Sequence, residues 1–355
     1  MRRCRHKPAE MKFVKFLGKG SYGSIHLFSN TKADGSSFYS AVKVSDDWTI
    51  EREFRILTEL KGCRRIVQLF EKTLVQETDH NGNRVYKMPM EYAAAGTLSN
   101  FIQRNRNLSD PVIKDFTRMI LQGLVSVHHR GYVHCDLKPD NLLLFPHYDK
   151  ETWDCSYELK IADFGLSLKA GEEESDCWEI DSPFVGTPVY MSPESVDDGT
   201  VEKALDLWSL GCIVLEMYTG KHPWFGVNVN DLQGFLADGK APEIPETVPL
   251  GARQFLEKCF SIEPKERGSA SELLLHPFLI GEVKMADVAG GETRRMGLRT
   301  RKPPMRFEDV IITKKPLKVK FVSSNLPQFK KVSNKPLKLK ILPPRPPKSS
   351  FVPVH

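Results

Sequence analysis

The feature that most constrains this chain is a polar stretch of eight residues, His134 to Asn141, which places an acid, a cation and an amide within six positions. Asp136 can accept the proton of an attacking hydroxyl, Lys138 can lie against a transferring phosphate, and Asn141 can hold a metal ion. This set suits phosphoryl transfer, because catalysis of that reaction depends mostly on positioning and charge neutralisation. One residue at a time, the same string is an ordinary polar loop between a helix and a strand. As an ordered set, it predicts a phosphoryl-transfer site.

Residues 13–28 predict two strands joined by a glycine-rich turn. The turn contains Gly18, Gly20 and Gly23, and β-branched and aromatic residues follow it. In a dinucleotide-binding fold such glycines must open a helix, whereas the residues after Gly23 favour a strand. An ordinary hairpin with three glycines is the structural alternative.

Two more strings stand at fixed places relative to these features. Ala41-Val42-Lys43 follows the glycine-rich turn, and Asp163-Phe164-Gly165 follows the polar stretch. Together the four strings resemble the phosphate lid, the phosphate-gripping strand, the catalytic loop and the metal motif of protein kinases. The resemblance implies ATP and Mg²⁺ as cofactors, with Asn141 and Asp163 holding the metal. The nucleotide-binding residues that it implies are Gly18, Lys19, Gly20, Gly23, Ile25, Ala41, Lys43, Met90, Glu91, Ala93 and Leu143.

Lys43 then needs an acidic partner on the next element. Ile50, Phe54, Leu57 and Leu60 recur at helical spacing and predict one buried stripe. Glu53 falls within that stripe, whereas Glu51 lies roughly 100° or more round the helix. We therefore predict that Glu53 pairs with Lys43, with Glu51 as second choice. Their separation of ten residues is shorter than kinases usually show, so the helix is expected to begin abruptly.

Further elements follow from apolar patterns and turn residues. Strands are predicted at 67–70 and 85–90, with a polar insert at 77–84 between them. Helices are predicted from Leu98 and from Ile113 to His128, and buried strands at 142–144 and 159–161 around an insert at 146–157. By resemblance, residues 91–93 form the hinge that binds adenine. Met90 then controls the depth of the pocket, or simply packs in the core.

Residues 163–194 resemble the kinase activation segment. Its candidate regulatory residues are Ser175, Ser182 and Thr187. Thr187 is the weakest of the three, because kinases use that position to contact Asp136 and Lys138. Downstream, Asp206 is expected to brace the catalytic loop, and Glu194 is expected to form a buried, structural pair with Arg267.

The resemblance covers about residues 11–280 and implies an α+β, bilobal kinase fold. An antiparallel sheet with one helix (about 11–92) precedes a mainly helical lobe (about 93–280). Lys138 and Thr187 mark the serine/threonine type, and the catalytic loop with the Met-Ser-Pro-Glu-Ser run resembles plant mitogen-activated protein kinase kinase kinases of the MEKK-like type. That resemblance implies phosphorylation of mitogen-activated protein kinase kinases; a serine/threonine kinase of another pathway is the alternative.

Charge divides the chain at residue 281. The tail, 281–355, has 18 Lys and Arg against 5 Asp and Glu, whereas residues 1–280 have 33 against 40. Its prolines and charge predict disorder, and a short basic extension precedes the domain at 1–10. Within 314–342, basic residues followed by alternating apolar residues resemble docking motifs of the mitogen-activated cascade. A solubilising or nuclear-targeting tail is the alternative, and nucleic-acid binding is not expected because aromatic residues for base stacking are lacking.

The seven cysteines are scattered without a C-x-x-C pair, which favours a reducing compartment over a disulfide framework or zinc site. No apolar run reaches membrane-spanning length, so no membrane association is expected. These features predict a cytoplasmic or nuclear protein.

One position departs from many kinases, which have Arg directly before the catalytic Asp where this chain has Cys135. That Arg ordinarily binds a phosphate on the activation loop. The acidic run at 172–176 is a solvated surface or a partial substitute for that phosphate, and Arg130 is a nearby cation that could replace the contact. A pseudokinase is the opposing hypothesis, but Lys43, Asp136, Asn141 and Asp163 are all present, so we expect an active enzyme.

Overall fold

The computed structural model describes residues 11–20, 22–32, 34–78, 82–105, 108–148, 155–171, 186–197 and 201–281. By its contacts the chain divides into two units, Met1–Val319 and Lys320–His355, and all described residues belong to the first. The predicted extension at 1–10, the tail from residue 282 onward with its segment 314–342, and Ser175 and Ser182 lie outside the described residues.

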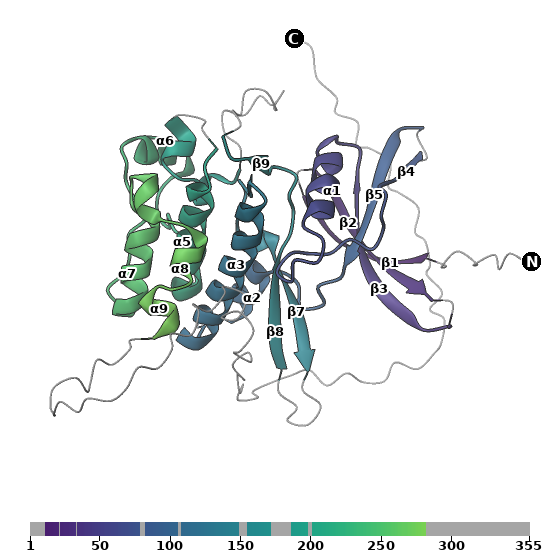
Figure 1. The fold of residues 1–355 in the computed structure, drawn as a ribbon, viewed down its shortest axis with the longest axis horizontal. Helices are drawn as coiled ribbons and strands as arrows, with labels where there is room; N and C mark the ends of the chain where they lie inside the picture. The colour runs from purple at the N-terminus through teal and green to yellow at the C-terminus, as the bar shows by residue number, and fades with distance from the viewer. Residues whose placement is uncertain are drawn as a thin grey trace, which may run out of the picture. The chain divides into compact units, whose positions relative to one another are not determined.

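An antiparallel sheet forms the N-terminal part of the described chain (Figure 1), with strands in the order β1-β2-β3-β5-β4. The strands are β1 (Met11–Gly20), β2 (Gly23–Thr31), β3 (Ser37–Ser45), β4 (Val75–Thr78) and β5 (Arg84–Glu91). Gly20 pairs with Gly23, so the glycine-rich stretch is a tight hairpin, as predicted. Gly23 has a φ of +140°, and a Cβ there would lie 2.5 Å from the carbonyl oxygen of Val44. Only glycine fits at this position.

The single helix of this part, α1 (Thr49–Glu59), begins shortly after β3, as expected. The stripe predicted from its periodicity is buried at Ile50, Leu57 and Leu60. Glu53 is buried in the same stripe, whereas Glu51 is exposed. The helical period therefore identified the correct acid.

The strand predicted at 67–70 is wrong. The structure has β4 at Val75–Thr78, inside and before the predicted polar insert. Residues 66–70 instead form isolated bridges, from Ile66 to Ile161 and from Leu69 to Met90. The amide of Val67 also donates to the carbonyl of Ile161 at 3.0 Å. Ile66 and Val67 are buried where the segment links two sheets, whereas Phe70 is exposed, and the segment forms no continuous ladder with either sheet.

The insert predicted at 146–157 is also wrong at both ends. The strands β7 (Leu142–Tyr148) and β8 (Cys155–Ile161) extend into it and pair as far as Tyr148 with Cys155. Residues 145–148 and 155–158 are half-buried or exposed, so no buried apolar pattern marked the continuation of the two strands. Residues 149–154 lie outside the described ranges.

Helices form the remaining part of the described chain. They are α2 (Leu98–Arg104), α3 (Asp110–His129), α4 (Glu194–Asp197), α5 (Ala204–Thr219), α6 (Val229–Ala237), α7 (Leu250–Cys259), α8 (Ala270–Leu273) and α9 (Pro277–Ile280). Two further strands, β6 (Tyr132–Val133) and β9 (Leu168–Lys169), pair with each other, and 3₁₀ turns span Pro139–Asn141, Pro188–Tyr190 and Pro264–Arg267. Among the described helices, none combines the length and apolar composition that crossing a membrane requires.

Helix α5 contacts α3 and α7 and is the buried centre of the helical part (Figure 1). A Cβ on Gly211 of α5 would lie 2.7 Å from the Cβ of Cys259 and 2.9 Å from the ring of Phe260. This glycine therefore lets α5 approach α7 closely. The predicted α+β class, with an antiparallel sheet and one helix before a mainly helical part, is confirmed.

Candidate active site

The polar stretch lies in the loop between β6 and β7, where α5 holds it in place. The carboxylate of Asp206 accepts hydrogen bonds from the backbone amides of His134, at 2.9 Å, and Cys135, at 3.2 Å. It also lies 2.8 Å from Nε2 of His128. Cys135 has a φ of +65°, a conformation that is costly for a residue with a Cβ. Asp206 therefore fixes a strained backbone immediately before Asp136.

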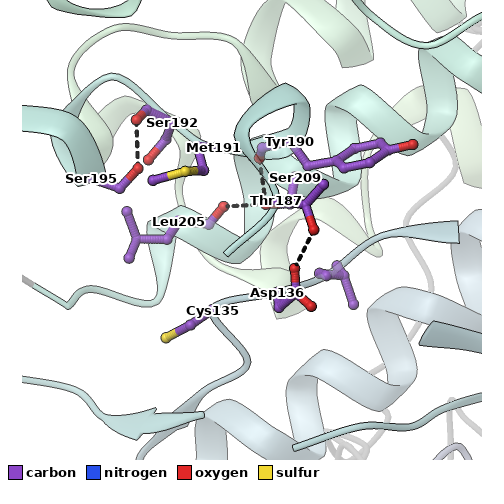
Figure 2. Close-up of a pocket in the computed structure, with 10 residues that line it drawn as sticks. Cys135, Asp136, Thr187, Tyr190, Met191, Ser192, Ser195, Leu205 and Ser209 are labelled. Carbon is purple, nitrogen blue, oxygen red and sulfur yellow. Dashed lines mark hydrogen bonds between the residues drawn. The ribbon is translucent and has the colours of Figure 1, made fainter. Parts of the chain in front are cut away.

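Asp136, Lys138 and Thr187 form a triangle of short contacts. The Thr187 hydroxyl donates to Asp136 at 2.7 Å (Figure 2) and accepts from the Lys138 ammonium at 2.7 Å. That ammonium lies 2.7 Å from the other carboxylate oxygen of Asp136. The contacts expected for Thr187 are present, and they bring the end of the activation segment onto the catalytic loop. Thr187 also borders a small pocket with Cys135, Tyr190 and Ser192 (Figure 2).

Asn141 connects the catalytic loop to Asp163. Its amide nitrogen donates to the backbone oxygen of Asp136 at 2.8 Å and to the carboxylate at 3.1 Å. The backbone carbonyl of Asn141 accepts from the backbone amide of Ala162 at 2.9 Å, one residue before Asp163, which has a φ of +64°. The side-chain oxygens of Asn141 and Asp163 are of the kind that Mg²⁺ prefers. These two residues therefore fit the metal implied by the kinase resemblance.

Lys43 of β3 and Glu53 of α1 form the predicted ion pair. Their charged atoms are 2.6 Å apart, with side chains that are 7% and 2% exposed. Asp163 lies on the other side of the ammonium at 2.8 Å. The backbone amide of the buried Phe164 also donates to Glu53, at 3.3 Å.

The opposite charges of this cluster keep Lys43 and Asp163 ionised. Burial alone lowers the pKa of the Lys43 ammonium, but Glu53 and Asp163 outweigh it and raise that pKa above its usual value. Burial alone raises the pKa of the Asp163 carboxyl, but Lys43 outweighs it and holds that pKa below its usual range. At neutral pH, Lys43 is therefore a cation and Asp163 an anion.

The apolar residues expected around the nucleotide pack against one core. Ala41 and Met90 are buried in it as neighbours on β3 and β5, and the half-buried Ile25 and Leu143 pack against it. Met90 is therefore a core residue. Ala93 is also buried, and its carbonyl accepts from the amide of Gly96 at 3.1 Å.

The side chain of Glu91 forms an ion pair with Lys160 within the protein. The Lys160 ammonium of β8 lies 2.7 Å and 2.9 Å from its two carboxylate oxygens, and its amide donates to the carbonyl of Gln68 at 3.0 Å. This ion pair was not predicted, because nothing in the local sequence links β5 to β8.

The glycines of the hairpin differ in their surroundings. A Cβ on Gly18 would meet no atom within 4 Å, and one on Gly20 would lie 4.0 Å from the nearest atom, whereas Gly23 has no room for one. Gly23 is required by the hairpin itself, whereas Gly18 and Gly20 leave open space, as a close ligand needs. Lys19 between them is exposed. Tyr22 in the hairpin turn was not predicted as a site residue; burial, and then the charges of Asp136, Asp47 and Asp163, raise the pKa of its phenol.

Glu194 and Arg267 form the predicted buried pair. The Arg267 side chain is fully buried, and its guanidinium donates to both carboxylate oxygens of Glu194, through Nη1 and, at 2.8 Å, through Nη2. The start of α4, which directly follows the Thr187 segment, is therefore fixed to the turn before α8.

The surroundings of Cys135 differ from a phosphate-binding site. Its side chain packs against an apolar cluster of Val133, Leu168, Val201 and Leu205. Arg130, the cation considered as a replacement, donates instead to the backbone oxygen of Glu59 at the end of α1. The position before Asp136 therefore has no guanidinium, and the guanidinium of Arg130 contacts α1.

Comparisons with known proteins agree with this geometry. The protein kinase domain family matches residues 11–279. The chain is 35% identical to the serine/threonine-protein kinase BCK1/SLK1/SSP31 of Saccharomyces cerevisiae, over 74% of this chain and 18% of that protein. It is 32% identical to mitogen-activated protein kinase kinase kinases 3 and 18 of Arabidopsis thaliana, over 78% and 76% of this chain and 43% and 77% of those proteins. The chain thus spans less than half the length of the first two relatives. The resemblance predicted from the motifs is confirmed, and the chain belongs to the protein kinase family, in its serine/threonine branch.

Proposed function

We propose that this chain is an active kinase that transfers the γ-phosphoryl group of ATP to Ser or Thr hydroxyls of mitogen-activated protein kinase kinases. The observation that carries the proposal is the connected set Glu53–Lys43–Asp163, with the triangle Asp136–Lys138–Thr187 nearby. A pseudokinase lacks or disconnects members of this set. Here all of them are present and held at hydrogen-bond distances.

The proposed roles follow from these contacts. ATP would supply the phosphoryl group, and a bound Mg²⁺ would neutralise part of its charge. Lys43, oriented by Glu53, would hold the phosphates under the hairpin of Gly18, Gly20 and Gly23, and Asn141 with Asp163 would hold the metal. Asp136 accepts the proton of the attacking hydroxyl. Lys138, which already contacts Asp136 and Thr187, offsets the charge that develops on the phosphate.

The test compares two strand lysines in a magnesium–ATP phosphorylation assay. Lys43→Met removes the buried cation and should lower turnover by about 10²-fold or more, because an oriented charge is lost from the transition state. Lys87→Met is the matched control: Lys87 on β5 also pairs with a glutamate at 2.6 Å, but at the surface, so turnover should stay unchanged. Asp136→Asn should be as inactive as Lys43→Met. Turnover above about half of wild type for Lys43→Met would contradict the assigned role.

The substrate class rests on the names of the relatives, several of which are mitogen-activated protein kinase kinase kinases. Purified mitogen-activated protein kinase kinases should be phosphorylated on Ser or Thr, and a phosphopeptide library should return no tyrosine sites. If library peptides are phosphorylated but no purified mitogen-activated protein kinase kinase is, the chain belongs to another signalling pathway.

We also propose that the basic tail, 281–355, docks such a substrate through segment 314–342, and that the protein acts in the cytoplasm or nucleus. Leu337 and Leu339 alternate along a basic stretch, with Lys330 and Lys331 upstream. Disordered basic segments bind modestly, so we expect micromolar affinity, about −8 kcal/mol, that weakens with salt. Leu337→Ala/Leu339→Ala and a 281–355 deletion should reduce capture of the kinase kinase. Equal capture by all forms favours a solubilising or nuclear-targeting tail, which imaging of a tail deletion then tests.

A further inference from the structure

Helix α1 needs support from outside itself to carry Glu53 accurately. It has 11 residues, a length at which isolated helices are marginal in water. Its first turn is supported by Asp47, which accepts from the amide of Thr49 at 2.7 Å. Its last turn has no basic residue and ends at the acidic Glu59. Because a helix C-terminus carries partial negative charge, this end is the weak one.

Two side chains from the helical part meet this weak end. The guanidinium of Arg130 donates to the backbone oxygen of Glu59. The hydroxyl of Tyr132 donates to the carboxylate of the same residue at 3.0 Å. Arg130 follows α3 directly, and Tyr132, which is buried, begins β6, the strand that leads into the catalytic loop. The Arg130 guanidinium and the Tyr132 hydroxyl thus donate hydrogen bonds to the backbone oxygen and the carboxylate of Glu59, at a helix end whose last turn has no basic residue.

The position of this contact bears on Glu53. Glu59 lies six residues beyond Glu53, about 9 Å along the same helix. A tilt or rotation of α1 that moved Glu59 would therefore move Glu53 away from Lys43. The segment after α1 is held separately, since Ile161 donates to the carbonyl of Arg65 at 2.8 Å. Arg130 and Tyr132 add a side-chain restraint on the helix itself.

We propose that Arg130 and Tyr132 are positioning residues, which hold the C-terminal end of α1 on the catalytic-loop strand and so keep Glu53 in contact with Lys43. In this chain, Cys135 cannot supply a guanidinium beside Asp136, and the guanidinium of Arg130 contacts α1 instead. The proposal rests on the proposed role of the Lys43–Glu53 pair.

The experiment uses the full chain with Arg130→Met, Tyr132→Phe and both changes together. Turnover of the double variant should fall about five- to tenfold, with a KM for ATP within about twofold of wild type, because orientation of the phosphates is lost more than binding. Amide hydrogen exchange should rise in residues 51–60 and not in α5. Arg130→Lys keeps a cation at the helix end and should retain more than about half of the turnover.

Two reference variants make each failure distinguishable. Arg64→Met removes a cation that is 76% exposed and pairs with Glu158, so turnover and α1 exchange should both stay unchanged. Glu53→Gln reports on the pair itself: if it leaves turnover intact, the proposed role of Lys43–Glu53 fails. If Glu53→Gln is impaired but the double variant keeps turnover and α1 exchange within twofold of wild type, the positioning role of Arg130 and Tyr132 is overturned. A loss of turnover accompanied by raised exchange throughout α5 also overturns it, since the residues would then be structural only.

Discussion

Arg267→Met removes the most deeply buried charge of the helical part. The Arg267 side chain is 0% exposed. Besides Glu194, its guanidinium donates to three backbone oxygens, those of Ser261 at 2.8 Å, Ala204 at 3.1 Å and Ile262 at 3.3 Å. It also lies over the ring of Trp208, 5.0 Å from its centroid. One side chain therefore joins the starts of α4 and α5 to the turn before α8.

The cost of the change follows from what remains. Methionine replaces most of the volume, so the loss comes from the Glu194 carboxylate and three carbonyls left without their donor. Breaking a buried pair by removing one partner costs about 3–5 kcal/mol. For a domain of this size each kcal/mol lowers the melting temperature by about 2–4 °C, so we expect a drop of roughly 10 °C. Arg267→Lys should recover only part of it, because one ammonium cannot reproduce the planar array of donors.

Thermal unfolding measured by circular dichroism tests this reasoning. Arg64→Met, which removes an exposed ion pair, should change the free energy of unfolding by less than about 1 kcal/mol. The double variant Glu194→Met/Arg267→Met should be more stable than Arg267→Met alone, because no charge is then left buried without a partner. A melting temperature for Arg267→Met within about 2 °C of wild type would refute the argument, as would a double variant whose losses simply add.

Three further predictions follow from single positions. Gly18→Ala should leave the melting temperature unchanged and raise the KM for ATP, whereas Gly23→Ala should lower the melting temperature, since its Cβ would meet the Val44 carbonyl at 2.5 Å. His276 caps α9 by accepting from the amide of Phe278 through Nδ1, and burial together with the charge of Lys258 lowers the pKa of the ring. Because the folded state favours the neutral ring, the free energy of unfolding should fall as the pH drops below about 6.5. His276→Asn should remove that part of the pH dependence of the melting temperature. Phosphatase treatment should leave most basal turnover, because Cys135 packs in an apolar cluster. Complete loss of turnover, restored by a phosphomimetic at Ser175, Ser182 or Thr187, would overturn this.

Sequence reasoning succeeded where the determining interactions are local. The helical period alone separated Glu53 from Glu51, and the structure has Glu53 buried against Lys43. The glycine hairpin was likewise set by the residues that form it, since Gly23 has no room for a Cβ. In both cases, the spacing of residues along the chain determines which side chains lie on the same face or in the same turn.

It failed where burial depends on a distant partner. Residues 66–70 cross between β8 and β5 through isolated bridges at Ile66 and Leu69, and a short apolar pattern cannot distinguish such a crossing from a strand. The ion pair of Glu91 with Lys160 and the contacts of Arg130 and Tyr132 with Glu59 join elements about 70 residues apart. In the sequence, these contacts were marked only by polar residues without a nearby partner along the chain, and many exposed polar residues have the same appearance.

The catalytic loop shows why these distant contacts matter to the chemistry. Cys135, which directly precedes Asp136, and Asp163 both have positive φ values, and Asp136 and Asp163 are the carboxylates proposed to take part in the reaction. Such conformations cost of order 1–3 kcal/mol each and persist only when the surroundings determine them fully. For Cys135, the surroundings are the Asp206 carboxylate, which accepts from the backbone amides of His134 and Cys135, and the apolar cluster against which the Cys135 side chain packs. A hydrogen bond to a charged group contributes about 1.5–3 kcal/mol, enough to offset the strain without a loop phosphate. Asp206 of α5 therefore holds the backbone that positions Asp136, and the small side chain of Cys135 packs in the apolar cluster without disturbing those hydrogen bonds.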